Sequence, residues 1–193
     1  IGRVEETQAC YGIGLYVMRK DWLIRNVKEA QARNLHHFER DMLQSHLHEM
    51  VIHGYEVTSL IMPIYSLESY YAANLALLDP QVRQALFPKS RPVYTKIRDC
   101  APAQYGLHAQ VTGSLVADGS HIDGKVNNCV IFRGVTVARD AELENCVIMQ
   151  DVTVSGGCKL RCILADKNAV FRENRVLQGF DTYPVYVAKN IIV

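Results

Sequence analysis

The sequence lacks any run of 18 apolar residues, so it predicts no helix that could cross a membrane. Its first hundred residues also lack the Gly-rich phosphate loops G-x-x-x-x-G-K and G-x-G-x-x-G. Neither sign of charge is in excess, because 21 Lys and Arg balance 20 Asp and Glu and leave a net charge of +1. This balance argues against nucleic acid as the main partner. Nothing near Ile1 resembles a signal peptide, and we expect the chain to be an excised piece of a longer protein.

The cysteines form neither a disulfide framework nor a zinc site. There are six, with no C-x-x-C pair, and the closest two, Cys158 and Cys162, have no second pair beside them. Without secretory signals, a reducing compartment, and hence the cytoplasm, is the expected location.

Four cysteine or serine positions instead begin copies of one short pattern, a small residue followed by two aliphatic residues and another apolar one. The copies start 15, 17 and 16 residues apart. They are Ser114–Ala117, Cys129–Phe132, Cys146–Met149 and Cys162–Ala165. The cysteines are therefore interpreted as small buried residues equivalent to Ser114.

Aliphatic residues also recur every six positions within these copies. Examples are Ile131, Val137 and Leu143, then Ile148, Val154 and Leu160, and the pair Val116 and Ile122. A six-residue period fits neither an α-helix nor an alternating strand. It predicts a three-sided coil whose successive turns pair as parallel strands. Residues 109 to about 175 would form roughly four coils of this kind.

The first hundred residues predict a mixed α/β arrangement. Helices are expected from Trp22, from about Arg40 to Met50, from Ser66 to Leu78 and around 82–87, and strands over 9–17 and 55–62. Asp21 would cap the first helix and Leu23, Ile24 and Val27 would form its apolar side. Pro88 and Pro92 bracket a connector toward the repeats.

The hexapeptide pattern resembles the left-handed parallel β-helix, and three stretches resemble the ADP-glucose pyrophosphorylases (glucose-1-phosphate adenylyltransferases). Phe38–Leu43 is similar to their "DFGKDI(I/L)" segment, and Ser69–Leu75 to their "SYYEANM" helix. Pro92–Arg98 with Ala101-Pro102 resembles their "PIYT…PR…PP" connector. The resemblance implies a division into residues 1–88 from the end of a nucleotidyltransferase domain, a connector over 89–108, and the β-helix and tail over 109–193.

Two departures from the family concern catalysis. The Asp that helps hold Mg²⁺ in catalytic members falls on Pro63, and the sugar-contacting Ser of their "SMGIY" strand falls on Gly12. Proline offers no side-chain oxygen to a hard cation. The resemblance thus implies a catalytically deficient regulatory subunit, with no cofactor of its own, that assembles with a catalytic glucose-1-phosphate adenylyltransferase subunit in glycogen biosynthesis.

An anionic-effector site is implied by the resemblance only. The "DKNA" segment makes Lys167 a candidate phosphate contact, and Arg98 lies in the connector motif. The family's second effector Lys is replaced by Gln104. An ordinary lysine at a coil corner is the competing interpretation of Lys167.

Other functions remain open at this point. A hexapeptide acyltransferase would use a His base, for which His108 and His121 are candidates. A zinc hydratase would need three convergent His, and the repeats supply only these two. A purely structural oligomerisation module is a third alternative. The apolar C-terminal segment 183–193 is expected to dock on the α/β half or on another subunit.

Overall fold

The computed structural model describes residues 4–5, 8–9 and 12–193, and its contacts divide the chain into two compact units, Ile1–Thr58 and Ser59–Val193. The domain boundary at residue 88 rests on the family resemblance and stays a prediction. No helix in the described part of the chain is long and apolar enough to cross a membrane.

The first unit contains short elements. They are β1 (Val4–Glu5), β2 (Gln8–Ala9), α1 (Lys20–Ala32), the π-helix η1 (Phe38–Leu43) and the 3₁₀ turn η2 (Gln44–His46), with β1 and β2 antiparallel. The prediction for α1 was partly wrong. The helix begins at Lys20 after Arg19, which makes no side-chain cap, and Asp21 lies in the first turn.

The apolar side predicted for α1 is exposed. Leu23, Ile24 and Val27 keep 36–47% of their surface accessible, whereas Asn26 and Ala30 are buried. The helix predicted over residues 40–50 is replaced by η1 and η2, which bury Met42 and Leu43.

Two predicted strands are absent from the described residues. Of the segment predicted over 9–17, only Ala9 lies in a strand, where Gln8–Ala9 pairs with Val4–Glu5. Residues 10–11 lie outside the described part of the chain. Neither 12–17 nor 55–62 forms a strand. A strand needs a neighbour to satisfy its N–H and C=O groups, and no pairing partner lies beside these segments among the residues described.

The second unit begins with α2 (Leu67–Ala76) and α3 (Pro80–Leu86). Ser66 caps α2 as predicted, through a capping box in which its hydroxyl accepts the Ser69 N–H and the Ser69 hydroxyl accepts the Ser66 N–H. Asp79 caps α3 and Pro80 occupies its first turn. The Arg83 guanidinium donates to the carbonyls of Leu77 and Leu78, just beyond the end of α2.

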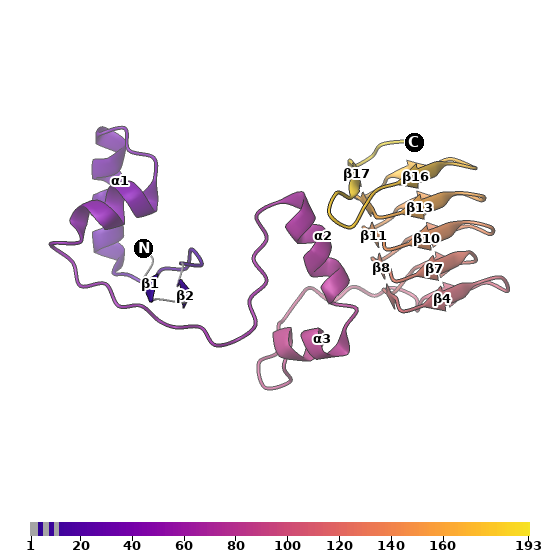
Figure 1. The fold of residues 1–193 in the computed structure, drawn as a ribbon, viewed down its shortest axis with the longest axis horizontal. Coiled ribbons are helices and arrows are strands. Elements are labelled where there is room, and N and C mark those ends of the chain that lie inside the picture. The colour runs from indigo at the N-terminus through magenta and orange to yellow at the C-terminus, as the bar shows by residue number, and fades with distance from the viewer. Residues whose placement is uncertain (1–3, 6–7, 10–11) are drawn as a thin grey trace. The chain divides into compact units, whose positions relative to one another are not determined.

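The rest of the second unit is a three-sided parallel β-helix with five strands on each side (Figure 1). Face I consists of β4 (Gln110–Thr112), β7 (Lys125–Asn127), β10 (Glu142–Glu144), β13 (Lys159–Arg161) and β16 (Val176–Gln178). Face II consists of β5 (Leu115–Val116), β8 (Val130–Ile131), β11 (Val147–Ile148), β14 (Ile163–Ala165) and β17 (Val185–Val187). Face III consists of β3 (Gln104–Tyr105), β6 (His121–Ile122), β9 (Thr136–Val137), β12 (Thr153–Val154) and β15 (Val170–Phe171).

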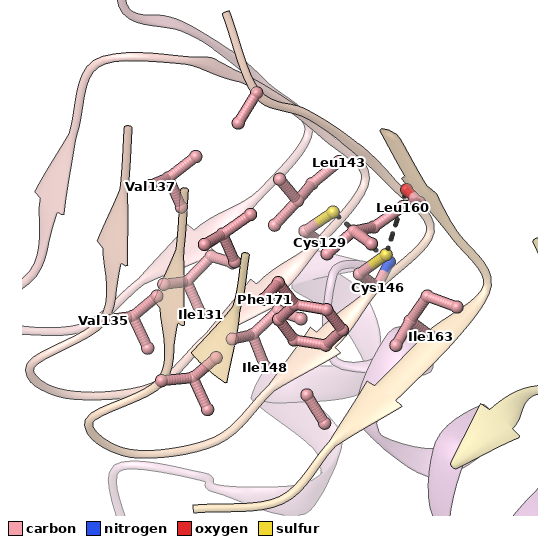
Figure 2. Packing of buried hydrophobic residues seen from close by; sticks show 14 of the residues in the cluster. Cys129, Ile131, Val135, Val137, Leu143, Cys146, Ile148, Leu160, Ile163 and Phe171 are labelled. Carbon is pink, nitrogen blue, oxygen red and sulfur yellow. Dashed lines mark hydrogen bonds between the residues drawn. The ribbon is translucent and has the colours of Figure 1, made fainter. Parts of the chain in front are cut away.

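The predicted parallel β-helix is therefore confirmed, and its pairing extends beyond 109–175, from Gln104 to Val187. The six-step aliphatic residues point into one core, where Val137, Leu143, Ile148 and Leu160 are at most 2% exposed. Figure 2 shows Val137, Leu143 and Ile148 converging on this interior from different walls of the coil.

The cysteine pattern holds for two of its members. Cys129 and Cys146 are fully buried, and the Cys146 N–H donates to the Cys129 sulfur (Figure 2). Burial raises the pKa of the Cys146 thiol, so it stays protonated. The alignment of Cys162 was wrong by one residue. Strand pairing sets Ile163, not Cys162, in register with Cys146.

Cys162 occupies the left-handed corner between faces I and II. Its φ of 52° matches those of Gly113, Asn128 and Asn145 at the same corner of earlier coils. Gly and Asn tolerate this conformation best, so a Cys here signals that its side chain has a specific contact.

The C-terminal segment docks on the β-helix itself, which corrects the predicted docking elsewhere. β17 pairs with β14, and Ile192 forms a parallel bridge with Val170. The Arg172 N–H donates to the Val193 carbonyl, and Val193 packs against the core.

Gly124 makes a close approach that predicts a strong mutational effect. A Cβ at this position would lie 2.5 Å from the Ala141 carbonyl oxygen and 2.7 Å from that of Ala138. Because both neighbours are backbone atoms of the next coil, Gly124→Ala should destabilise the β-helix by about 1–3 kcal/mol in urea unfolding. At the comparable Gly156 the nearest atom is 3.1 Å away, so Gly156→Ala should cost less. Equal midpoints for the two variants would contradict this packing argument.

Candidate functional site

The two positions implied in catalysis lie in different units. Gly12 is exposed in the first unit, and Pro63 is exposed in the second, just before the Ser66 cap. Met62 and Ile64 flank Pro63, so the position presents no side-chain oxygen as a ligand. The residues present do not fit the Mg²⁺ of catalytic family members. Across the described residues, no three His, Cys, Asp or Glu side chains are grouped to hold a metal.

The best-formed interaction surface of the second unit is the contact of α2 with face II. Val147 and Leu164 project outward from this face and are buried, together with Tyr71 of α2. Figure 1 shows α2 alongside β8 and β11, and α2 contacts β11. Tyr70 and Phe132 are among the partly buried residues that pack against this cluster.

Tyr71 anchors α2 to the corner between faces I and II. Its side chain is 1% exposed, and its hydroxyl donates a hydrogen bond to the Asn145 carbonyl. Burial, with smaller contributions from Cys162 and other neighbours, raises the pKa of the Tyr71 phenol. The phenol is therefore a neutral donor at any physiological pH.

Cys162 joins the same corner to the loop that follows β16. Its thiol lies 3.2 Å from the Asp181 carboxylate, to which it donates. Burial, followed by the bond to Asp181, raises the pKa of this thiol. The backbone N–H of Val185 donates to the Cys162 carbonyl. These contacts account for a Cys in a left-handed corner.

Sequence reasoning matched Tyr71 to a family motif but did not assign it this role. Nothing in the spacing of Tyr71 and Cys162, 91 positions apart, indicates that they meet. The signal that could have located the contact is the run of outward apolar residues Val130, Val147 and Leu164 on face II, which needs a cover.

The candidate effector residues are separated within the second unit. Gln104 lies in β3 at one edge of face III, and Lys167 lies in the turn between β14 and β15, with β15 four strands away from β3. Four strand spacings amount to about 19 Å. Arg98 is exposed in the connector. One chain therefore does not gather the three side chains at a single point, and their role in binding an effector stays a prediction.

Lys167 occupies a structured corner. The Asp166 carboxylate accepts the Lys167 N–H at 2.7 Å and the Tyr186 hydroxyl at 3.1 Å. The Lys167 carbonyl accepts the Asn190 N–H of the C-terminal segment. The backbone of Lys167 is thus fixed while its side chain is exposed to solvent.

The two histidines considered for acyl transfer lie near Asp123. The Asp123 carboxylate accepts the His108 N–H at 3.0 Å and lies 3.4 Å from the His108 ring. The His108 backbone hydrogen bond is the main cause that lowers the pKa of Asp123, and His121 contributes weakly. This arrangement fastens the first coil to the second.

Comparison with known proteins identifies relatives for most of the chain. Residues 100–183 match the family described as GlmU-like, C-terminal hexapeptide. The glycogen biosynthesis protein GlgD of Bacillus subtilis is 35% identical over 143 residues, which are 74% of this chain and 42% of that protein. GlgD of Geobacillus stearothermophilus is 41% identical over 69 residues, or 36% of this chain and 20% of that protein. Glucose-1-phosphate adenylyltransferase of Thermotoga maritima is 28% identical over 131 residues, 66% of this chain and 31% of the enzyme.

Together, the β-helix and the hexapeptide match define a hexapeptide-repeat protein. More particularly, the chain is a homologue of the GlgD glycogen biosynthesis proteins and of glucose-1-phosphate adenylyltransferases, which confirms the family resemblance. The matched part is less than half of each of these relatives.

Proposed function

We propose that this chain is the regulatory and assembly part of a glucose-1-phosphate adenylyltransferase subunit in glycogen biosynthesis. The reaction forms ADP-glucose and pyrophosphate from ATP and glucose 1-phosphate. The observation that carries the proposal is Pro63, exposed at the position where the family resemblance expects a metal-binding Asp, in a chain most of which matches a GlgD protein. Stabilising the transferred phosphoryl charge relies on such a metal.

The proposed partner is a catalytic glucose-1-phosphate adenylyltransferase subunit. This chain would need no cofactor of its own, whereas Mg²⁺ would serve the catalytic partner. Free thiols at the described cysteines support a cytoplasmic location.

The test combines the 193-residue chain with the catalytic glucose-1-phosphate adenylyltransferase of the same organism. Co-purification is expected, with a changed rate or effector response, and the chain alone should form no ADP-glucose above background. ADP-glucose formation by the chain alone would overturn catalytic deficiency. Failure to bind any catalytic subunit would overturn the assembly role. Turnover of acetyl-CoA that is lost in His108→Ala would instead support the acyltransferase alternative.

Regulation gives a second measurable consequence. Lys167→Ala should raise the effector concentration for half-maximal response of the assembled enzyme by about tenfold or more, because one charge-assisted hydrogen bond contributes roughly 1.5–3 kcal/mol. Lys159→Ala removes an exposed lysine from face I and is the matched control. An unchanged effector response in Lys167→Ala would leave this residue as an ordinary corner lysine.

A further inference from the structure

The three faces of the β-helix differ in the polarity of their outward side chains and in whether these are covered. Face II is apolar and covered by α2. Face I carries charges that pair within the face, with Lys125 to Glu142 at 3.1 Å and Arg161 to Glu144 at 3.6 Å. A face that neutralises its own charges in this way is suited to water.

Within the second unit, face III has neither a covering helix nor such charges at its centre. Its two outward rows have half-buried Thr136, Ala138, Thr153 and Ser155 at their middle. All four are small and uncharged, so the centre of the face is flat. Depletion of charge at the centre of a patch is typical of protein interfaces.

Opposite charges lie on either side of the centre of the second outward row. Strand register orders this row as Gly106, Asp123, Ala138, Ser155 and Arg172. Asp123 and Arg172 are separated by three strand spacings, or about 14 Å. The midpoint between them falls between Ala138 and Ser155.

This arrangement is complementary to itself under a two-fold rotation. Consider an axis that lies between two facing copies and runs parallel to the strands. Rotation about this axis makes the β-helices of the two copies run in opposite directions. Each outward row of one copy then faces the same row of the other copy. Asp123 of each copy then faces Arg172 of the other, Ala138 faces Ser155, and Thr136 faces Thr153. A closed dimer of this kind uses the same patch twice.

We propose that face III binds face III of a second copy of this chain in this antiparallel two-fold arrangement. The proposal rests on the charge complementarity of Asp123 and Arg172 and does not depend on the proposed function. His108 and His121 are the other titratable groups near Asp123, and the Asp123 bond to the His108 N–H persists in the dimer.

The size of the face sets the expected strength of binding. Five strands about 4.8 Å apart, and about four residues across, give roughly 24 by 13 Å, or about 300 Å² for each copy. Both copies together remain below the 1,200 Å² that is typical of stable complexes. The dimer should therefore be weak and should depend on protein concentration.

Charge exchange between copies tests the orientation directly. In sedimentation equilibrium, Arg172→Glu alone and Asp123→Lys alone should each weaken dimerisation at least tenfold, because each homodimer then contains two like-charge pairs. An equimolar mixture of the two variants should recover wild-type dimerisation, since the mixed dimer contains one native pair and one reversed pair. Undiminished dimerisation of Arg172→Glu, or no recovery in the mixture of folded variants, would overturn the proposal.

A second pair of variants tests the proposal even if Asp123→Lys does not fold. Ser155→Arg places a long cation at the centre of face III and should weaken dimerisation at least tenfold, whereas Gln178→Arg on face I should leave it unchanged. Equal dimerisation of these two variants would overturn the proposal. A chain that stays monomeric at every concentration but binds the catalytic subunit would also overturn it, and would leave the proposed function intact.

Discussion

Val137→Asp is expected to abolish the cooperative folding of the β-helix. Val137 has no exposed surface and is in register with Ile122 on one side and Val154 on the other. A carboxylate there would enter an interior lined by aliphatic side chains and thiols, with no group to pair with it. The cost is several kcal/mol, comparable to the whole stability of a domain, which is about 5–15 kcal/mol.

The neighbouring residue supplies the control. Thr136 precedes Val137 in β9 and is half-buried on the outer surface, so in the monomer Thr136→Asp leaves the same carboxylate in contact with water. Circular dichroism and urea unfolding should show loss of the transition for Val137→Asp and a midpoint near wild type for Thr136→Asp. A normal transition for Val137→Asp would mean that this position is not in the core.

The β-helix could be predicted from sequence because its order is local. Ile131, Val137 and Leu143 succeed one another at six-residue steps, and each needs only its own coil and the next to become buried. Hydrophobic periodicity therefore carries enough information to place these residues inside. The one-residue error at Cys162 shows the limit of this periodicity. In the sequence, a Cys at a left-handed corner cannot be distinguished from a small apolar residue of the core.

The first unit could not be predicted equally well, because its apolar segments depend on neighbours. Leu15 and Val17 read as a buried strand, yet they are 80% and 105% exposed and unpaired among the residues described. Leu23, Ile24 and Val27 have helical spacing, and α1 does form, but the predicted apolar side is not covered. Local propensity can begin a helix, whereas burial requires a surface to pack against.

The candidate site could be predicted from the sequence better than the first unit but less well than the β-helix. Motif resemblance located Ser69–Leu75 as a helix, and the capping box of Ser66 fixes its start. What the helix packs on could not be read from the sequence. Tyr71 and Asn145 are 74 residues apart, and their contact follows from the apolar outward row of face II.

Tyr71→Ala should therefore detach α2 from the β-helix without unfolding the coils. Truncating a buried aromatic side chain costs about 3–5 kcal/mol, and here the loss falls on one helix and its contacts with Val147, Cys162 and Leu164. Hydrogen exchange should become faster by at least a hundredfold for the amides of α2. Amides of β10 and β13, which lie on face I, should keep their protection, because local opening does not require the coils to separate.

Tyr71→Phe separates the ring from its hydroxyl. It keeps the packing of the ring and removes the hydrogen bond to the Asn145 carbonyl, so exchange in α2 should rise only about fivefold, corresponding to about 1 kcal/mol. Equal effects of the two variants would show that the hydroxyl, and not the ring, holds the helix. Wild-type exchange in Tyr71→Ala would mean that α2 does not depend on face II. The expected order, with Ala far more damaging than Phe, follows from the much larger contribution of aromatic burial than of a single neutral hydrogen bond.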